Sequence, residues 1–236
     1  MRKVAFYFFV VINLIRSIFY LIWAKIYEKI GKEDKLNAIV ERFVLKVTAN
    51  ISKGIRLNYE VVGEENIPDE ACLFVSNHQS YFDVLAITHA VGKSVGFVAK
   101  EELKKIIYFR YWLVKGHCVF INRKNPRQGL KAINEAANKI KNGQSMVIFP
   151  EGTRSKGTEV APFKKGSMKI AIKAGAKIVP VSVEGTYKAY EKTKGFNRVD
   201  AKIIFNEPID TKELSKEELV DIHEKIRKNI AESIAV

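Results

Sequence analysis

The sequence predicts an α/β protein with a mixed, largely parallel sheet flanked by helices, preceded by an N-terminal membrane-associated helical hairpin. Three observations lead to this prediction. From residue 55 onward, short apolar runs alternate with helical patterns, which is the order of an α/β domain. Before that point, two long segments carry apolar residues at helical spacing. The chain of 236 residues is 47% hydrophobic, which is enough for a substantial core and excludes an intrinsically disordered protein.

The first helix of the hairpin is expected in the apolar stretch from Val4 to Trp23, where Asn13, Arg16 and Ser17 are polar interruptions. At the centre of a membrane span, Arg16 would cost roughly 2.5–3.5 kcal/mol, whereas each Leu, Ile, Phe or Val contributes about −0.3 to −0.6 kcal/mol. The sum still favours the membrane, so a span and a helix lying in one leaflet both stay open. A signal peptide is disfavoured because no small-residue cleavage site follows the apolar run.

The second helix is expected between Leu36 and Ile51, whose apolar residues follow helical spacing. The stretch Gly31–Asp34 predicts the turn between the two helices. We interpret residues 1–54 as a membrane-anchoring two-helix segment dipped into one leaflet, and residues 55–236 as the α/β domain. The alternative for the second helix is an amphipathic helix that packs on the core of that domain.

The charge distribution supports a membrane-facing hairpin. Lys and Arg number 40 and Asp and Glu 26, which gives a net charge of +14. Residues 1–56 carry 11 of the basic and 4 of the acidic residues, so half of the excess lies in the most apolar quarter of the chain. A segment that is both basic and apolar favours an anionic membrane surface over nucleic acid. The basic residues also predict that the following domain lies on the cytoplasmic face of the cell membrane.

The α/β domain is read from its apolar runs and the helical patterns between them. The expected strands are Ile55–Val62, Ala71–Ser76, Ser94–Ala99, His117–Ile121, Ser145–Phe149, Ile178–Val183 and Ala201–Phe205. The expected helices are Tyr81–Ala90, Lys100–Phe109, Pro126–Lys141, Lys164–Ala174 and Ser215–Ile234. Ligands of such sheets bind in the loops that follow the strands.

Several common chemistries are absent from the sequence. It contains no GxxxxGK[ST], no GxGxxG and no GxSxG motif, which excludes the usual nucleotide fingerprints and the serine nucleophile elbow. No His/Cys cluster has zinc spacing, so no metal site and no bound cofactor are expected. The two cysteines, Cys72 and Cys118, are too few for a disulfide framework and indicate a reducing compartment.

The first candidate site is the segment Asn77–Asp83. His78 follows an expected buried strand, and Asp83 lies five residues later near the start of a helix. A carboxylate on one ring nitrogen of a histidine leaves the other nitrogen free to accept a proton, which makes a general base. The structural alternative is a capping box, because Ser80 and Asp83 have the S-x-x-D spacing of a helix start.

The second candidate site is the segment Phe149–Ser155. A buried strand runs into a Pro/Gly turn that presents Glu151 and Arg154, and a guanidinium suits phosphate. Arg123 and Lys100 follow two other strands and are expected to point to the same place. The alternative is a charged surface turn with a Glu–Arg pair.

Taken together, these segments resemble a known family. The ordered set is Asn77-His78-x4-Asp83, Gly116-x3-Phe120-Ile121-Asn122-Arg123, Phe149-Pro150-Glu151-Gly152-Thr153-Arg154-Ser155 and Ile178-Val179-Pro180-Val181. The set resembles the HX4D glycerolipid acyltransferases, in particular the 1-acyl-sn-glycerol-3-phosphate (lysophosphatidic acid) acyltransferases. The resemblance covers roughly residues 58–210, and it departs at Asn122, where the family often has Asp.

The resemblance implies acyl transfer without an acyl-enzyme. His78 would deprotonate the sn-2 hydroxyl of lysophosphatidic acid, and Asp83 would orient His78. The acyl donor would be acyl-CoA or acyl-carrier protein, and the product phosphatidic acid, a precursor in phospholipid biosynthesis. The residues implied to bind the glycerol phosphate are Lys100, Arg123, Glu151, Gly152, Thr153 and Arg154. Val179 and Pro180 would border the acyl-donor site.

Two alternatives remain open from the sequence. One is an acyltransferase of the same family with another lysolipid acceptor, since the four motifs do not discriminate among acceptors. The other is a non-catalytic membrane protein that binds anionic lipid. Nucleic acid is not an expected partner, because no recognition motif accompanies the basic residues.

Overall fold

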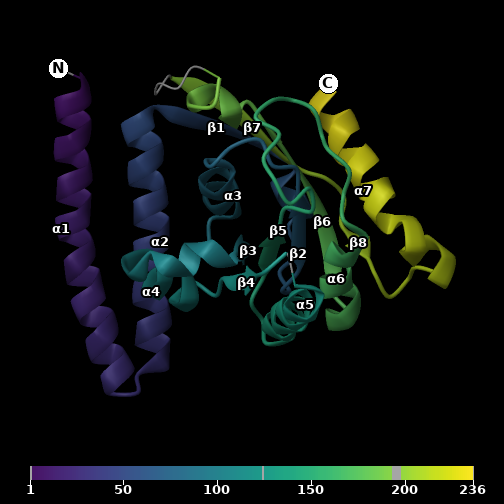
Figure 1. The fold of residues 1–236 in the computed structure, drawn as a ribbon, viewed down its shortest axis with the longest axis horizontal. Helices are drawn as coiled ribbons and strands as arrows, with labels where there is room; N and C mark the ends of the chain where they lie inside the picture. Colours follow the sequence, from purple (N-terminus) through teal and green to yellow (C-terminus); the bar gives the residue numbers. More distant parts are fainter. Residues whose placement is uncertain (1, 124, 193–197, 236) are drawn as a thin grey trace.

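A mixed sheet with helices on both faces forms the body of the protein, and a helical hairpin lies at one side (Figure 1). The structure is a computed structural model and describes residues 2–123, 125–192 and 198–235. The sheet has eight strands in the described part of the chain, in the order β1-β7-β6-β2-β5-β3-β4, with β8 paired to β6. Every pairing is parallel except those of β6 with β7 and β8, which confirms the mixed, largely parallel sheet.

The expected strands all form, and one short strand, β8, adds to them. The strands are β1 (Leu57–Val62), β2 (Leu73–Ser76), β3 (Gly96–Lys100), β4 (Val119–Ile121), β5 (Met146–Ile148), β6 (Lys177–Glu184), β7 (Val199–Phe205) and β8 (Ile209–Asp210). The helices are α1 (Arg2–Lys29), α2 (Glu33–Ile55), α3 (Asp83–Val91), α4 (Ile107–Lys115), α5 (Pro126–Lys141), α6 (Lys169–Ala174) and α7 (Lys216–Ala235).

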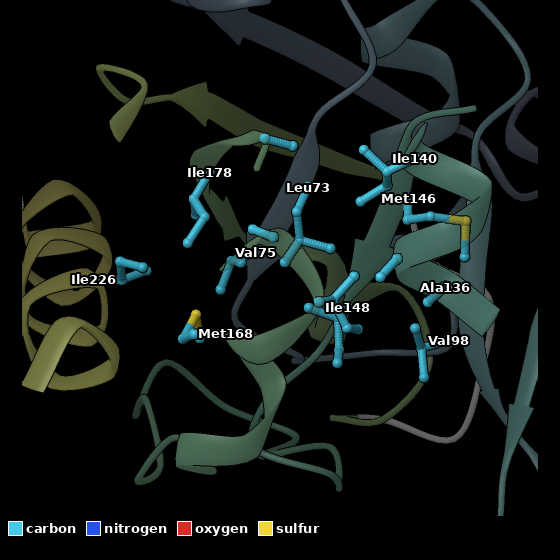
Figure 2. Packing of buried hydrophobic residues seen from close by; sticks show 14 of the residues in the cluster. Leu73, Val75, Val98, Ala136, Ile140, Met146, Ile148, Met168, Ile178 and Ile226 are labelled. Carbon is cyan, nitrogen blue, oxygen red and sulfur yellow. The ribbon is translucent and has the colours of Figure 1, made fainter. Parts of the chain in front are cut away.

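Strand β2 lies inside the sheet and is buried on both faces, which explains its continuous apolar sequence. Leu73 and Val75 point to the face covered by α5, α6 and α7, where Figure 2 shows them packed near Ile178 and Ile226. Phe74 points to the opposite face, which α3 covers. This two-residue alternation fixes the register of the central strand, because a slip of one residue would exchange the two cores.

Helix α5 shows how local sequence sets a boundary. The side chain of Asn125 accepts hydrogen bonds from the backbone N–H groups of Arg127 and Gln128, and Pro126 occupies the first turn. Ala132, Ala136 and Ile140, spaced four residues apart, are buried against the sheet. Both the predicted start and the predicted end of this helix are correct.

Two expected helices differ from the structure. The expected helix Lys100–Phe109 is a 3₁₀ turn, Glu101–Lys105, followed by α4, and the two are separated at Ile106, whose backbone is extended with φ −88° and ψ 93°. The β-branched pair Ile106–Ile107 makes this junction a weak point for helix. The expected helix Lys164–Ala174 likewise begins as a 3₁₀ turn, and only its second half is α6.

The N-terminal hairpin is present, with α1 and α2 side by side (Figure 1). Helix α2 also packs on the body of the protein, since the Phe43 and Trp112 rings stack with centroids 3.6 Å apart. Helix α1 exposes large apolar side chains: Val11, Ile15, Ile18, Phe19, Ile22, Trp23 and Ile26. Among the described residues, no helix combines the length and hydropathy that a membrane crossing requires. Helix α2 ends at Ile55, beside the boundary expected after residue 54.

Candidate active site

Two neighbouring strands bring the two sequence motifs together. β2 and β5 are parallel and paired, with Val75 opposite Ile148, so both end at the same edge of the sheet. The loop after β2 carries His78, and the loop after β5 carries Glu151 and Arg154. This edge is the usual ligand-binding side of such sheets.

His78 and Asp83 form the hydrogen-bonded pair that their spacing predicts. Nδ1 of His78 lies 2.7 Å from Oδ2 of Asp83. The Asp83 carboxylate is fully buried, and Oδ2 also accepts hydrogen bonds from the backbone N–H groups of Gln79 and Ser80. The hydroxyl of Thr186 donates to Oδ1. Helix α3 begins at Asp83 with Phe82 as its N-cap, so the bond from the Ser80 N–H does not belong to the capping box that the spacing offered as an alternative.

These contacts fix the orientation of the His78 ring. Because Asp83 also accepts from two backbone N–H groups, we assign the proton of this bond to Nδ1 of His78, which leaves Nε2 as the nitrogen that can accept a proton. The His78 ring stacks on Phe149 with centroids 4.1 Å apart and an interplanar angle of 17°, and its side chain keeps 19% of its surface exposed. The imidazole is therefore held on one face and open to a reactant.

Glu151 holds the backbone of the histidine loop. It is 7% exposed, and its two carboxylate oxygens accept hydrogen bonds from the N–H of His78 at 2.6 Å and the N–H of Ala161 at 3.2 Å. Burial raises the pKa of Glu151 to about 7, against the lowering effect of these two bonds. The His78 carbonyl in turn accepts from the N–H of Ser155 at 2.8 Å. The predicted contact of Glu151 with substrate stays a prediction, because both oxygens bind the protein.

A cationic niche surrounds Gly152. This residue has φ +76°, and a side-chain carbon there would lie 2.9 Å from Nζ of Lys164 and 3.6 Å from Nη1 of Arg123. Only glycine combines this backbone conformation with such a close approach. Thr153 follows it and is exposed. Two cations and an open backbone make a place where an anion fits.

Arg154 is positioned by an acidic residue from another loop. Its Nη1 lies 3.2 Å from Oε1 of Glu191, and its guanidinium lies 3.4 Å from the ring centre of Tyr81. Glu191 also accepts hydrogen bonds from the Ser80 hydroxyl and the Tyr81 N–H. Arg154 therefore borders the histidine loop with its guanidinium orientation fixed.

The other predicted site residues are Lys100, Val179 and Pro180, and their contacts lie away from His78. Lys100 ends β3 beside the end of β4, is exposed, and pairs with Glu102 at 3.1 Å. Val179 and Pro180 lie in β6 and are buried within the sheet. Their predicted border with the acyl donor stays a prediction.

Burial makes both cysteine thiols poor nucleophiles. It raises the pKa of Cys72 to about 12 and that of Cys118 to about 11, so both stay protonated thiols near neutral pH. Within the described residues, no three His, Cys, Asp or Glu side chains gather as a metal site would require. Neither cysteine is therefore expected to act as a nucleophile near neutral pH.

The sequence interpretation missed two charged residues of the site, Lys164 and Glu191. Lys164 follows the second motif in the run Phe163-Lys164-Lys165-Gly166, and this basic pair was a usable signal. Glu191 lies 37 residues after Arg154 in a polar stretch without any local pattern. Only the fold brings it to the site.

A known protein family matches this chain. The family model described as Acyltransferase matches residues 58–184, which is more than half of the chain. The chain belongs to the acyltransferase family. The resemblance drawn from the motifs is thereby confirmed at the level of the family.

Curated members of the family carry a more specific name. The chain is 33% identical over 205 residues to the chloroplastic 1-acyl-sn-glycerol-3-phosphate acyltransferase BAT2 of Brassica napus, covering 85% of this chain and 58% of that protein. It is 31% identical to the 1-acyl-sn-glycerol-3-phosphate acyltransferase of Borreliella burgdorferi, covering 85% of this chain and 80% of that protein.

A solved structure of the family has the same fold. The crystal structure of the 1-acyl-sn-glycerophosphate (LPA) acyltransferase PlsC from Thermotoga maritima matches with a TM-score of 0.75 and 30% identity. The match covers 100% of this chain and 98% of that one. The agreement includes the N-terminal hairpin, because the whole of this chain is covered.

Proposed function

We propose that this protein transfers a fatty acyl group to the sn-2 hydroxyl of 1-acyl-sn-glycerol-3-phosphate and so forms phosphatidic acid for phospholipid biosynthesis. The acyl donor is acyl-CoA or acyl-carrier protein. The observation that carries the proposal is the buried Asp83 on Nδ1 of a partly open His78, beside a cationic niche. The names of the similar family members from Brassica napus and Borreliella burgdorferi support the same acceptor.

His78 acts as the general base. Nε2 takes the proton of the acceptor hydroxyl as the oxygen attacks the thioester carbonyl, and Asp83 stabilises the imidazolium that results. The tetrahedral intermediate then collapses, the C–S bond breaks, and the imidazolium returns its proton to the leaving thiolate. Neither buried cysteine is needed for this direct transfer.

The phosphate of the acceptor binds the cations around Gly152. Arg123 and Lys164 converge there, and Arg154 borders the histidine loop, so a phosphate at this place holds the free sn-2 hydroxyl near His78. Gly152 and Thr153 contribute backbone and hydroxyl groups, and Lys100 lies at the same edge of the sheet.

The hairpin holds this site at a membrane, on the cytoplasmic face. The support is the apolar surface that α1 exposes together with the basic residues of both helices. An interfacial hairpin within one leaflet suits an amphipathic acceptor, because that substrate resides in the same plane. Lipid, and not nucleic acid, is the partner in this proposal.

The deciding experiment measures free thiol released from acyl-CoA and from acyl-carrier protein, with a panel of lysolipids as acceptors. We expect release that depends on 1-acyl-sn-glycerol-3-phosphate and falls by about 10²–10⁴-fold in His78→Ala. Thiol release with only a different lysolipid would show that this lysolipid is the acceptor in place of 1-acyl-sn-glycerol-3-phosphate. Vesicle binding without thiol release from any pair would contradict the enzymatic proposal and favour a lipid-binding protein.

A further inference from the structure

A cavity of about 440 Å³ lies between α1 and α2, in the hairpin that Figure 1 shows beside the body of the protein. Two cations line it, Arg16 from α1 and Lys46 from α2. The cavity is separate from the candidate active site, because none of its lining residues belongs to the loops after β2 or β5. The residues that line it therefore need an explanation separate from the active site.

The polar part of the lining is positively charged. Besides Arg16 and Lys46 it contains Asn13, Ser17 and Asn50. Nδ2 of Asn50 donates a 2.7 Å hydrogen bond to Oδ1 of Asn13 across the two helices. No acidic side chain is among the residues that line the cavity. The walls thus offer cationic and amide donors to an anion and no carboxylate to repel it.

The rest of the surroundings is apolar. The rings of Tyr20 and Phe43 pack with centroids 5.5 Å apart at the cavity, and Phe19 lines it with 62% of its surface exposed. Ile15 and Ile18, on either side of Arg16 in α1, are half exposed. In contact with lipid, a cation within such an apolar surface is costly unless an anion accompanies it.

We propose that this cavity binds the phosphate of an anionic phospholipid headgroup, with Arg16 and Lys46 as its ligands and the apolar walls against the proximal acyl chain. The inference rests on the proposed membrane contact of the hairpin. It explains why a strongly apolar helix carries an arginine midway along its length. It also gives the hairpin a preference for anionic lipid that is independent of substrate turnover.

The experiment compares cosedimentation of the full-length protein with two kinds of vesicle. One contains phosphatidylcholine only, and the other contains equal amounts of phosphatidylcholine and phosphatidylglycerol. The test variant is Arg16→Gln with Lys46→Gln. The matched control is Lys29→Gln with Arg42→Gln, which removes one exposed lysine and one exposed arginine from the same two helices outside the cavity.

We expect the test variant to lose about ten-fold more affinity for anionic vesicles than the control, the equivalent of one lost charge-assisted hydrogen bond. Both should keep the wild-type affinity for neutral vesicles. Equal losses would mean diffuse attraction only and would overturn the site. A further control adds millimolar inorganic phosphate, with chloride at the same ionic strength as the reference. If phosphate abolishes the preference of the wild-type protein for anionic vesicles, the cavity binds a free anion, and the proposed lipid site is overturned.

A charge-conserving exchange, Arg16→Lys with Lys46→Arg, covers the case in which the test variant misfolds. If the test variant loses binding to neutral vesicles as well, retained anionic preference in the exchange variant supports the site, and its loss overturns it. Failure of the wild-type protein to bind either kind of vesicle contradicts the membrane contact itself. Acyl transfer is measured separately as thiol release. A failure of the enzymatic proposal is therefore distinguishable from a failure of the membrane contact or of the headgroup site.

Discussion

The two loops that form the candidate active site are held in different ways. In the loop after β2, Asp83 binds His78 and two backbone N–H groups, all within five residues of itself. In the loop after β5, Glu151 binds the backbone of His78, 73 residues away, and Arg154 pairs with Glu191, 37 residues away. The pair that orients the base is local in sequence, whereas Glu151 and Arg154 are held by distant residues. The first loop is also tied to the rest of the fold, through Thr186 and Glu191.

This difference separates two tasks of the site. The local pair of His78 and Asp83 fixes the orientation of the proposed base. In the loop after β5, Glu151 accepts a hydrogen bond from the backbone N–H of His78, and cationic groups surround Gly152. Substitutions in the first loop should therefore change turnover, whereas those around the second should change stability or acceptor affinity.

The largest effect is expected from Asp83→Asn. A neutral amide does not stabilise the imidazolium and does not fix Nδ1 as the protonated nitrogen, so kcat should fall by about 10²–10⁴-fold, with little change in the KM of the acceptor. Steady-state kinetics measure both constants. Asp69→Asn, at an exposed residue before β2, is the control. Near-normal kcat in folded Asp83→Asn would remove the proposed role of the pair.

The sequence predicted the parts of the fold that depend on local pattern. Short apolar runs identified β2 and β5 because strands buried on both faces need no polar residue. The break at Ile106 was missed because apolar and charged residues alternate through it without a glycine or a proline. It is set by backbone geometry and by packing of α4 on the hairpin, which periodicity does not record.

The same distinction applies to the site. His78 and Asp83 were predictable because five residues of chain place them within reach of each other. Glu191 was not, because its contact with Arg154 exists only after β6 has been placed beside β2. Lys164 is intermediate, since it lies in a basic pair near the second motif but reaches Gly152 through a folded loop.

The second prediction concerns Glu151, which links the two loops. Burial raises the pKa of Glu151 to about 7, above its ordinary 4.5. Between these values the folded protein binds more protons than the unfolded chain, so this group's stabilisation is complete below about 4.5 and is lost as the pH rises through about 7. The shift corresponds to about 3 kcal/mol.

Glu151→Gln should therefore flatten the pH dependence of the unfolding free energy across this window. Denaturant unfolding near about pH 5 and about pH 8 measures it in both proteins. Glu159→Gln, at an exposed position in the same loop, should leave the wild-type slope intact. Parallel curves for wild type and Glu151→Gln would show that the carboxyl group titrates normally.

The third prediction tests the cationic niche. Arg123→Ala removes a guanidinium whose Nη1 lies near Gly152, and we expect kcat/KM for lysophosphatidic acid to fall by about thirty-fold, or about 2 kcal/mol. A monoacylglycerol, which lacks the phosphate, should be affected much less. Arg127→Ala, an exposed arginine in the first turn of α5, is the control. An equal loss with both acceptors would exclude Arg123 as a phosphate ligand.

The smallest effect is expected from Glu191→Ala, which removes the distant support of Arg154. The guanidinium would keep its stacking on Tyr81 but lose the ion pair that sets its direction, so the KM of lysophosphatidic acid should rise by about five-fold, or about 1 kcal/mol, while kcat stays nearly constant. Glu191→Gln, which keeps an acceptor for Ser80, should recover part of the loss. A fall in KM would mean that Glu191 competes with the phosphate for Arg154. A fall in kcat alone would mean that Glu191 acts mainly through its hydrogen bonds with Ser80 and Tyr81 in the histidine loop, and not through Arg154.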